Sequence, residues 1–321
     1  MTPVTDRRLL TPGFVMDLFR PCAVGATARE RLAPWLRLVS IAAFTAVSTF
    51  WLMLILPGAV GTDVLVYRAG ASEIIGGDPW AASHQGMSFA APPLEAFAFL
   101  PATLVPEDVF VGVWVLASAI GALVIVRRLS LPAWWLLYPP LVAGVIGSNP
   151  AVLGMAAVVA GWRLVGVILR PQLIMVVGWR AATLFAALSV GAILLRPDFI
   201  TGLVDNIARY QIQSGSPINF WLSPLMVPAM AALVLLWRVD RHAASWLVMP
   251  AVGPAMGWYG FTMVMPVRSL PLALACIFPV PGLGAAAITL YALWRWWCRG
   301  DGARAGPAQS PPDPGAATRP D

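Results

Sequence analysis

The chain has 321 residues, of which 59% are hydrophobic and 11% charged, and its formal net charge is +6. A water-soluble domain carries about a quarter charged residues, so this composition excludes a soluble globular protein, a disordered chain and a small secreted disulfide domain. An integral membrane protein remains, and at about 20 residues per spanning helix the length allows roughly ten crossings at most. The arginines are scattered between apolar runs and form no basic stripe, so nucleic-acid binding is not expected.

The first long apolar run, residues 38–58, follows an arginine-rich segment. The positive-inside rule therefore places residues 1–37 and the N-terminus in the cytoplasm. The run begins too late in the chain for a cleavable signal peptide. Cys22, Cys276 and Cys298 lie far apart and without metal-ligand spacing, so we expect no disulfide and no zinc site.

Residues 61–87 are polar and follow the first span, so we expect them outside the cytoplasm. Apolar residues in this loop recur at helical spacing, namely Val64, Tyr67, Ala71, Ile74 and Ile75. This spacing predicts a short amphipathic helix along the membrane surface, ended by Gly76-Gly77-Asp78-Pro79.

Residues 88–105 are apolar but contain three prolines and Glu95. The next span, residues 109–126, ends in Arg127-Arg128, which should be cytoplasmic. A full crossing by residues 88–105 would place this arginine pair outside. We therefore expect a re-entrant or interfacial segment there.

Spans are then predicted at residues 131–147 and 150–162. The segment 164–179 carries Arg170-Pro171 at its middle, which predicts two half-crossings hinged at the proline. Further spans are predicted at residues 181–197, 221–237, 243–258 and 271–294, with outer loops at residues 198–220 and at Arg268. The membrane domain thus covers residues 38–299, and residues 300–321 form a polar tail that should be disordered and cytoplasmic.

Two charged residues stand out as candidates for chemistry. Asp63 follows the first span closely, where a carboxylate can act as a general base on a substrate at the membrane surface. The alternative is that Asp63 only caps the following helix. Arg170 interrupts an apolar segment, and its guanidinium suits a phosphate, although snorkelling or pairing with a carboxylate would also explain it.

Other polar and aromatic residues of the outer segments are weaker candidates. His84 can carry a proton, and aromatic side chains such as Tyr67, Trp80 and Phe89 can stack on a sugar ring or simply belong to the interfacial belt. The chain has no P-loop, dinucleotide fingerprint, HExxH, GxSxG or CxxC motif, so we expect no nucleotide, cofactor or metal. The candidate substrate-binding residues are Tyr67, Arg68, Asp78, Trp80, His84, Arg170 and Arg268.

Several motifs together resemble the glycosyltransferase family 87 membrane proteins, which are typified by polyprenol-phosphate-mannose-dependent α-mannosyltransferases. The resembling segments are Gly61–Gly70, Gly76–Trp80, Ala91-Pro92-Pro93-Leu94, Gly147-Ser148-Asn149-Pro150 and Arg170-Pro171-Gln172-Leu173. This chain departs from the family pattern at Ala91, Ser148 and Arg170, where the family has tyrosine, glutamine and lysine.

The resemblance implies an all-α GT-C fold of about eight to ten transmembrane helices in a bacterial plasma membrane. It also implies transfer of a sugar, mannose in the typical members, from a polyprenyl-phosphate donor to a lipid-linked glycan, with inversion and with Asp63 as general base. Two alternatives remain open at this stage. One is a lipid-glycan flippase or transporter, and the other is a non-catalytic partner in the cell envelope.

Overall fold

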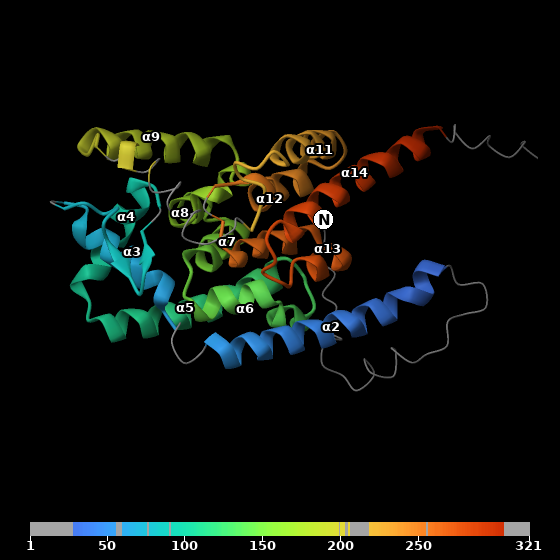
Figure 1. Ribbon diagram of the computed structural model, residues 1–321, viewed down its shortest axis with the longest axis horizontal. Helices are drawn as coiled ribbons and strands as arrows, with labels where there is room; N and C mark the ends of the chain where they lie inside the picture. Colours follow the sequence, from blue (N-terminus) through green and yellow to red (C-terminus); the bar gives the residue numbers. More distant parts are fainter. Residues whose placement is uncertain are drawn as a thin grey trace, which may run out of the picture.

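The computed structural model describes residues 28–55, 60–75, 77–89, 91–198, 200–202, 205, 218–254 and 256–304. The structure is 76% helical, which confirms the all-α prediction. In Figure 1, α3 (Thr62–Glu73), α4 (Pro93–Phe99) and α9 (Trp179–Leu195) lie at one end of the molecule. The C-terminal helix α14 (Leu283–Arg304) extends towards the other end.

Two helices are long and apolar enough to cross a membrane, and both were predicted. The first candidate span is Ala33–Leu54, within α2 (Ala28–Ile55), and the second is α5 (Glu107–Arg128). Helix α2 begins ahead of the predicted start at residue 38. Its first residues include arginine and glutamate, which have good helix propensity and extend the helix beyond its apolar part.

The predicted spans at residues 131–147 and 150–162 are not two crossings. The first of them is divided between the 3₁₀ turn η2 (Ala133–Leu137) and the short helix α6 (Pro139–Ile146). Helix α6 and α7 (Pro150–Ala160) meet at an angle of 113°, and only together do they reach the length of one broken span or a re-entrant loop.

The bend between α6 and α7 has a local cause in the turn that joins them. Ser148 has a left-handed φ of 56°, and the side chain of Asn149 caps α7 by accepting a hydrogen bond from the Ala151 N–H. Pro150 then starts the new helix, where a missing N–H costs nothing. The described helices therefore give two candidate crossings, or three with the bent pair, and do not confirm the predicted eight to ten.

The predicted break at Arg170-Pro171 is present. Helix α8 (Arg163–Leu169) ends at Arg170, whose backbone is extended with φ −149° and ψ 90°. The 3₁₀ turn η3 (Pro171–Met175) follows. Proline disfavours helical geometry at the residue before it and has no N–H to continue the helix, so the sequence itself ends α8 at this point.

Helices α7 and α8 touch backbone to backbone through two glycines. A Cβ atom added to Gly154 would lie 3.0 Å from the carbonyl oxygen of Gly166, and one added to Gly166 would lie 2.6 Å from that of Gly154. Small residues permit the same close approach between helices in membranes. The crossing sets α8, and thus Arg170, directly against α7.

The C-terminal third is more interrupted than predicted. It contains α11 (Met226–Val239), α12 (Arg241–Val252), the 3₁₀ helix η4 (Trp258–Val267), α13 (Leu270–Ala275) and α14. The predicted span at residues 271–294 is broken between α13 and α14, where two prolines and Gly282, at φ 72°, end the helical geometry. Helix α14 extends to Arg304, so the start of the predicted disordered tail is helical, and residues 305–321 lie outside the described residues.

The first outer loop forms a compact subdomain rather than a helix lying alone on a surface. The predicted helix is present as α3, but most of its residues are buried. They pack with α4, the 3₁₀ turn η1 (Leu100–Leu104) and a hairpin of β1 (Ser83–His84) and β2 (Met87–Ser88). Five buried aromatic residues belong to this core: Tyr67, Trp80, Phe89, Phe99 and Phe110.

Arg196, at the end of α9, holds the segment that follows α3. Its guanidinium donates hydrogen bonds to the carbonyl oxygens of Ile74 and Gly77 at 2.8 and 2.9 Å. It also forms an ion pair of 2.8 Å with Asp198, which lowers the pKa of that carboxyl. The turn predicted at residues 76–79 is thus fixed by a residue far along the chain, although Gly76 itself lies outside the described residues.

Candidate functional site

The start of α3 is docked on the bend between α6 and α7. The Asp63 N–H donates to the carbonyl oxygen of Gly147 at 3.1 Å, and the Gly61 N–H donates to that of Ile146 at 3.1 Å. The Asn149 side chain donates from Nδ2 to Oδ2 of Asp63 at 2.8 Å. Two segments that the sequence analysis singled out separately therefore meet at one carboxylate.

Asp63 does not cap its own helix. Gly61 occupies the N-cap position with φ 78°, and no side chain caps α3. The Asp63 residue is partly exposed, but its carboxyl lies deep enough for burial to dominate, so the pKa of Asp63 is raised. The hydrogen bond from Asn149 and the charge of Arg170 oppose this shift. The carboxyl is thus held by other elements, in surroundings that favour its taking up a proton.

Arg170 lies next to this carboxyl and is 3% exposed. Its Nη1 donates to the hydroxyl of Tyr67 at 3.2 Å, and its guanidinium lies 5.6 Å from the ring centroid of Tyr259. The sequence analysis named Arg170 and Tyr67 independently, and the structure brings them together. Because Arg170 is buried, its guanidinium acts on the site through its positive charge rather than through hydrogen bonds from exposed N–H groups.

Glu95 is a buried charge that the sequence analysis did not propose for the site. It lies in the first turn of α4, is 1% exposed, and its Oε1 has no hydrogen-bond partner among the described residues. Arg170 influences both carboxyls, Glu95 and Asp63. In the sequence, Glu95 could have been recognised as a carboxylate inside a short apolar run. Burying such a group costs free energy unless a partner compensates its charge.

Helix α4 lies outside the candidate spans, and burial raises the pKa of Glu95 to about 8, although the Arg170 charge opposes the shift. The folded state therefore binds this proton more tightly than the unfolded chain, in which the pKa is 4.5. Stability should fall as pH rises from about 4.5 to about 8 and then level off. Thermal unfolding of the wild type and Glu95→Gln across this pH range tests it, because the variant should lose this dependence. Parallel pH profiles would contradict the expectation.

Asn149 has two roles, as cap of α7 and as donor to Asp63. Asn149→Ala should lower stability by about 1–2 kcal/mol through loss of the cap. Asn149→Asp keeps the cap oxygen but places a second carboxylate against Asp63 at a buried position, so it should raise the pKa of Asp63 and lose more stability than Asn149→Ala. Unfolding measurements on both variants test this. A smaller loss from Asn149→Asp than from Asn149→Ala would contradict the expected repulsion.

The side chains of two other predicted residues, Arg68 and Asp78, make polar contacts within the fold. Arg68 forms an ion pair of 3.1 Å with Glu107 and donates to the carbonyl oxygens of Ala102 and Val105, so it fixes η1 to α5. Asp78 Oδ1 accepts from the Trp80 N–H at 3.0 Å, which forms the turn after α3.

Trp80 and His84 lie beside this turn. The Trp80 ring packs on Phe89 with ring centroids 5.5 Å apart. His84 lies in the hairpin, and its Nε2 has no hydrogen-bond partner among the described residues. None of the contacts described here joins either residue to Asp63.

Arg268 does not join the Asp63 cluster. It lines a cavity together with Leu36, near the start of the first candidate span, and with Arg295 of α14. The sequence analysis put Arg268 outside and Arg295 at the cytoplasmic end. The structure instead places both residues along one cavity, next to the break between α13 and α14.

Comparisons with protein-family models, curated proteins and solved structures found no match. Among the described residues, no cluster of three or more histidine, cysteine, aspartate or glutamate side chains could hold a metal ion. Cys276 and Cys298 are free thiols, the first buried and the second exposed. Cys22 lies outside the described residues. The proposed function therefore depends on the geometry of the Asp63 site.

Proposed function

We propose that this protein is a membrane glycosyltransferase that moves a sugar from a polyprenyl-phosphate donor to a lipid-linked glycan, with Asp63 as the general base. The sugar is mannose if the family resemblance holds. In this proposal the membrane is a bacterial plasma membrane, the site faces its outer side, and both termini are cytoplasmic.

One observation carries the proposal. Asp63, the Gly147–Pro150 turn and the Arg170-Pro171 hinge lie far apart in the sequence. Hydrogen bonds join the turn to Asp63, and the charge of Arg170 acts on the same carboxyl. Asn149 and the Gly147 carbonyl fix the position of Asp63, and Arg170 supplies a fixed positive charge. A carboxyl held in place by other elements, with a raised pKa, suits proton abstraction from a bound hydroxyl.

The reaction follows from this arrangement. The acceptor hydroxyl donates its proton to the Asp63 carboxylate while its oxygen attacks the anomeric carbon of the donor sugar. The bond from that carbon to the phosphate oxygen breaks, and the polyprenyl phosphate leaves with the electron pair. Attack from the face opposite the leaving group inverts the anomeric configuration.

Arg170 opposes the rise in the pKa of Asp63 that burial causes. With Glu95 protonated below its raised pKa, ionisation of Asp63 leaves one carboxylate beside one guanidinium. Arg170 then favours the charged form of the base and attracts the departing phosphate through the field of a buried cation.

The test is a membrane assay in which labelled polyprenyl-phosphate sugars are supplied and the labelled lipid product is identified. Label should pass from polyprenyl-phosphate mannose to a larger lipid-linked glycan, and should do so without added nucleotide sugar. Absence of transfer from every polyprenyl-phosphate sugar supplied, with the protein folded in the membrane, would contradict the proposal.

Broken helices favour a second candidate, a transporter of lipid-linked glycans. The α6–α7 bend and the α8–η3 break both lie against the polar cluster, and discontinuous helices form the substrate sites of many transporters. Proteoliposomes loaded with a fluorescent lipid-linked glycan separate the two functions, because a transporter moves the lipid between leaflets without changing it. A non-catalytic partner predicts Asp63 packed against its own helix with no cavity beside it, and the hydrogen bond from Asn149 departs from the first of these two conditions.

A further inference from the structure

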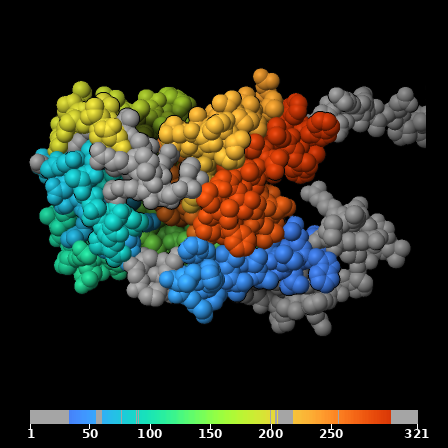
Figure 2. Space-filling view, in the orientation of Figure 1, coloured from blue at the N-terminus to red at the C-terminus, as the bar shows by residue number. Residues whose placement is uncertain are grey.

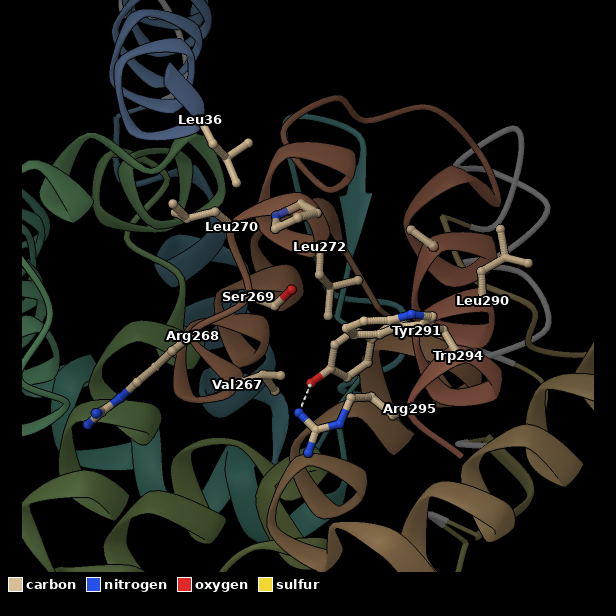
Figure 3. A pocket seen from close by; sticks show the side chains of 12 residues that line it. Leu36, Val267, Arg268, Ser269, Leu270, Leu272, Leu290, Tyr291, Trp294 and Arg295 are labelled. Atoms are coloured by element: carbon tan, nitrogen blue, oxygen red, sulfur yellow. Dashed lines mark hydrogen bonds between the residues drawn. The ribbon is translucent and has the colours of Figure 1, made fainter. Parts of the chain in front are cut away.

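A cavity of about 780 Å³ lies between α2, α13 and α14, away from α3 and α4. Its walls are mostly apolar, with Leu270, Leu272 and Leu290 among them. Figure 3 shows the Ser269 hydroxyl and the Tyr291 ring near the centre, with Arg295 directly beside Tyr291 and the Arg268 side chain extending away from them to one side. Ligand sites measure about 300–1,000 Å³ and combine apolar walls with a few polar groups, so this cavity has the size and lining of one.

The two arginines differ in how far their charge is compensated. Arg295 forms an ion pair of 3.2 Å with Asp240 and donates to the Tyr291 hydroxyl at 3.4 Å. The Arg268 residue is exposed, and its guanidinium makes no ion pair or hydrogen bond with any residue that the structure describes. The rim of the cavity therefore keeps one uncompensated positive charge, with an apolar interior beside it.

Exposed tryptophans show where this cavity lies relative to a bilayer. Trp35 of α2 and three tryptophans of α14 are exposed close to the lining residues Leu36, Trp294 and Arg295 in sequence. Tryptophans gather at the headgroup level of membranes, where one end of the ring meets lipid and the other meets water. In Figure 2 the blue surface of α2 and the red surface of α14 diverge on either side of a hollow at this part of the molecule. The three tryptophans of α14 are Trp294, Trp296 and Trp297.

We propose that this cavity binds a bilayer phospholipid with an anionic headgroup, its phosphate at Arg268 and the upper part of its chains against Leu270, Leu272 and Leu290. The positive rim matches the phosphate, the apolar walls match the chains, and the tryptophans place both at headgroup depth. Such a site holds a structural or regulatory lipid. It does not depend on the function proposed for Asp63.

The test is a titration of the full chain, purified and stripped of lipid in detergent, followed by native mass spectrometry. The probes are phosphatidylglycerol and phosphatidylcholine with identical chains. One phosphatidylglycerol should bind more tightly than phosphatidylcholine. Arg268→Gln should weaken phosphatidylglycerol about fivefold, since a basic residue near an anionic membrane contributes about that factor.

A matched control is Arg241→Gln. Arg241 is exposed, belongs to α12 beside Asp240 and does not line the cavity. Its loss should leave the affinity for phosphatidylglycerol unchanged. Equal affinity for the two lipids, or equal weakening by the two arginine variants, would overturn the proposal. So would displacement of the lipid by inorganic phosphate, which would make the cavity a phosphate site.

A second variant tests the cavity without changing its charge. Ala287→Trp fills the space from α14 and should abolish the tight phosphatidylglycerol site, while the unfolding temperature reports whether the chain still folds. If this variant does not fold, Leu290→Trp replaces it, because Leu290 is exposed at the rim and can accept a larger ring. Tight binding that persists in the folded filled variant would place the lipid elsewhere and overturn the proposal.

Discussion

Asp63→Asn should reduce sugar transfer by about 100-fold or more, because a general base contributes about 10²–10⁴ to the rate. Asparagine has the shape of aspartate, and its side-chain oxygen can still accept the hydrogen bond from Asn149. The variant should therefore fold and bind donor, yet have no group that takes the acceptor proton. The measurement is the initial rate of label transfer from polyprenyl-phosphate mannose in membranes with equal amounts of folded protein.

The matched control for this variant is Asp108→Asn. This variant makes the same change of one carboxylate to an amide. Asp108 is exposed in the first turn of α5, and its carboxyl is not part of the site. Its transfer rate should equal that of the wild type. If Asp63→Asn transfers sugar as fast as Asp108→Asn, Asp63 is not the base. Transfer by the wild type in the same assay would then support the transferase with a different base.

Arg170→Met should destabilise the protein by about 3 kcal/mol, because removing one partner of a buried charge cluster leaves the other charges uncompensated. Methionine keeps much of the length of arginine and fills its apolar path. The loss would fall on Asp63 and Glu95, both of which feel the Arg170 charge, and on the Tyr67 hydroxyl. Unfolding in detergent, followed by circular dichroism, measures the change.

A double variant separates lost charge balance from lost packing. Above about pH 8, where Glu95 is ionised, Arg170→Met combined with Glu95→Gln removes the cation and one of its carboxylates, so the double variant should be more stable than the sum of the single changes predicts. Strict additivity would show that Arg170 and Glu95 do not interact. An Arg170→Met variant as stable as the wild type would show that the buried guanidinium is not needed to balance the cluster.

Local signals made several elements predictable from sequence. The apolar runs of α2 and α5 are long and uninterrupted, and apolar residues recur at helical spacing in α3. Arg170-Pro171 marks a break by the chemistry of proline alone. Each of these predictions depends on residues close together in the chain, where propensity and hydropathy act directly.

The predictions that were wrong depend on which neighbour an apolar side chain meets. Residues such as Val152 and Met155 of α7 are fully buried in protein, although hydropathy alone makes them look like a lipid-facing span. Hydropathy measures the cost of water contact and does not distinguish lipid from a protein core. Short buried helices were therefore read as crossings, and the bend at Ser148 was missed.

The site was predictable in its members but not in its pairings. Asp63, Tyr67 and Arg170 were named from the sequence, yet nothing in it states that Arg170 bonds to Tyr67 or that Asn149 bonds to Asp63. These contacts join residues that are 86 or more positions apart. Glu95 was missed because the apolar run that contains it is short and interrupted by prolines. The free-energy cost of burying its carboxyl without a partner was therefore not considered.

The glycine contact between α7 and α8 has a consequence for how accurately Arg170 is positioned. Where side chains separate two helices, a rotamer change can absorb a shift, but Gly154 and Gly166 meet with only main-chain atoms between them. A Cβ atom on Gly154 would lie 2.9 Å from the Cβ of Arg170 itself. One extra methyl group would thus displace the cation relative to Asp63. The two glycines therefore help to set the distance between Arg170 and Asp63, on which the electrostatic interaction of these two residues depends.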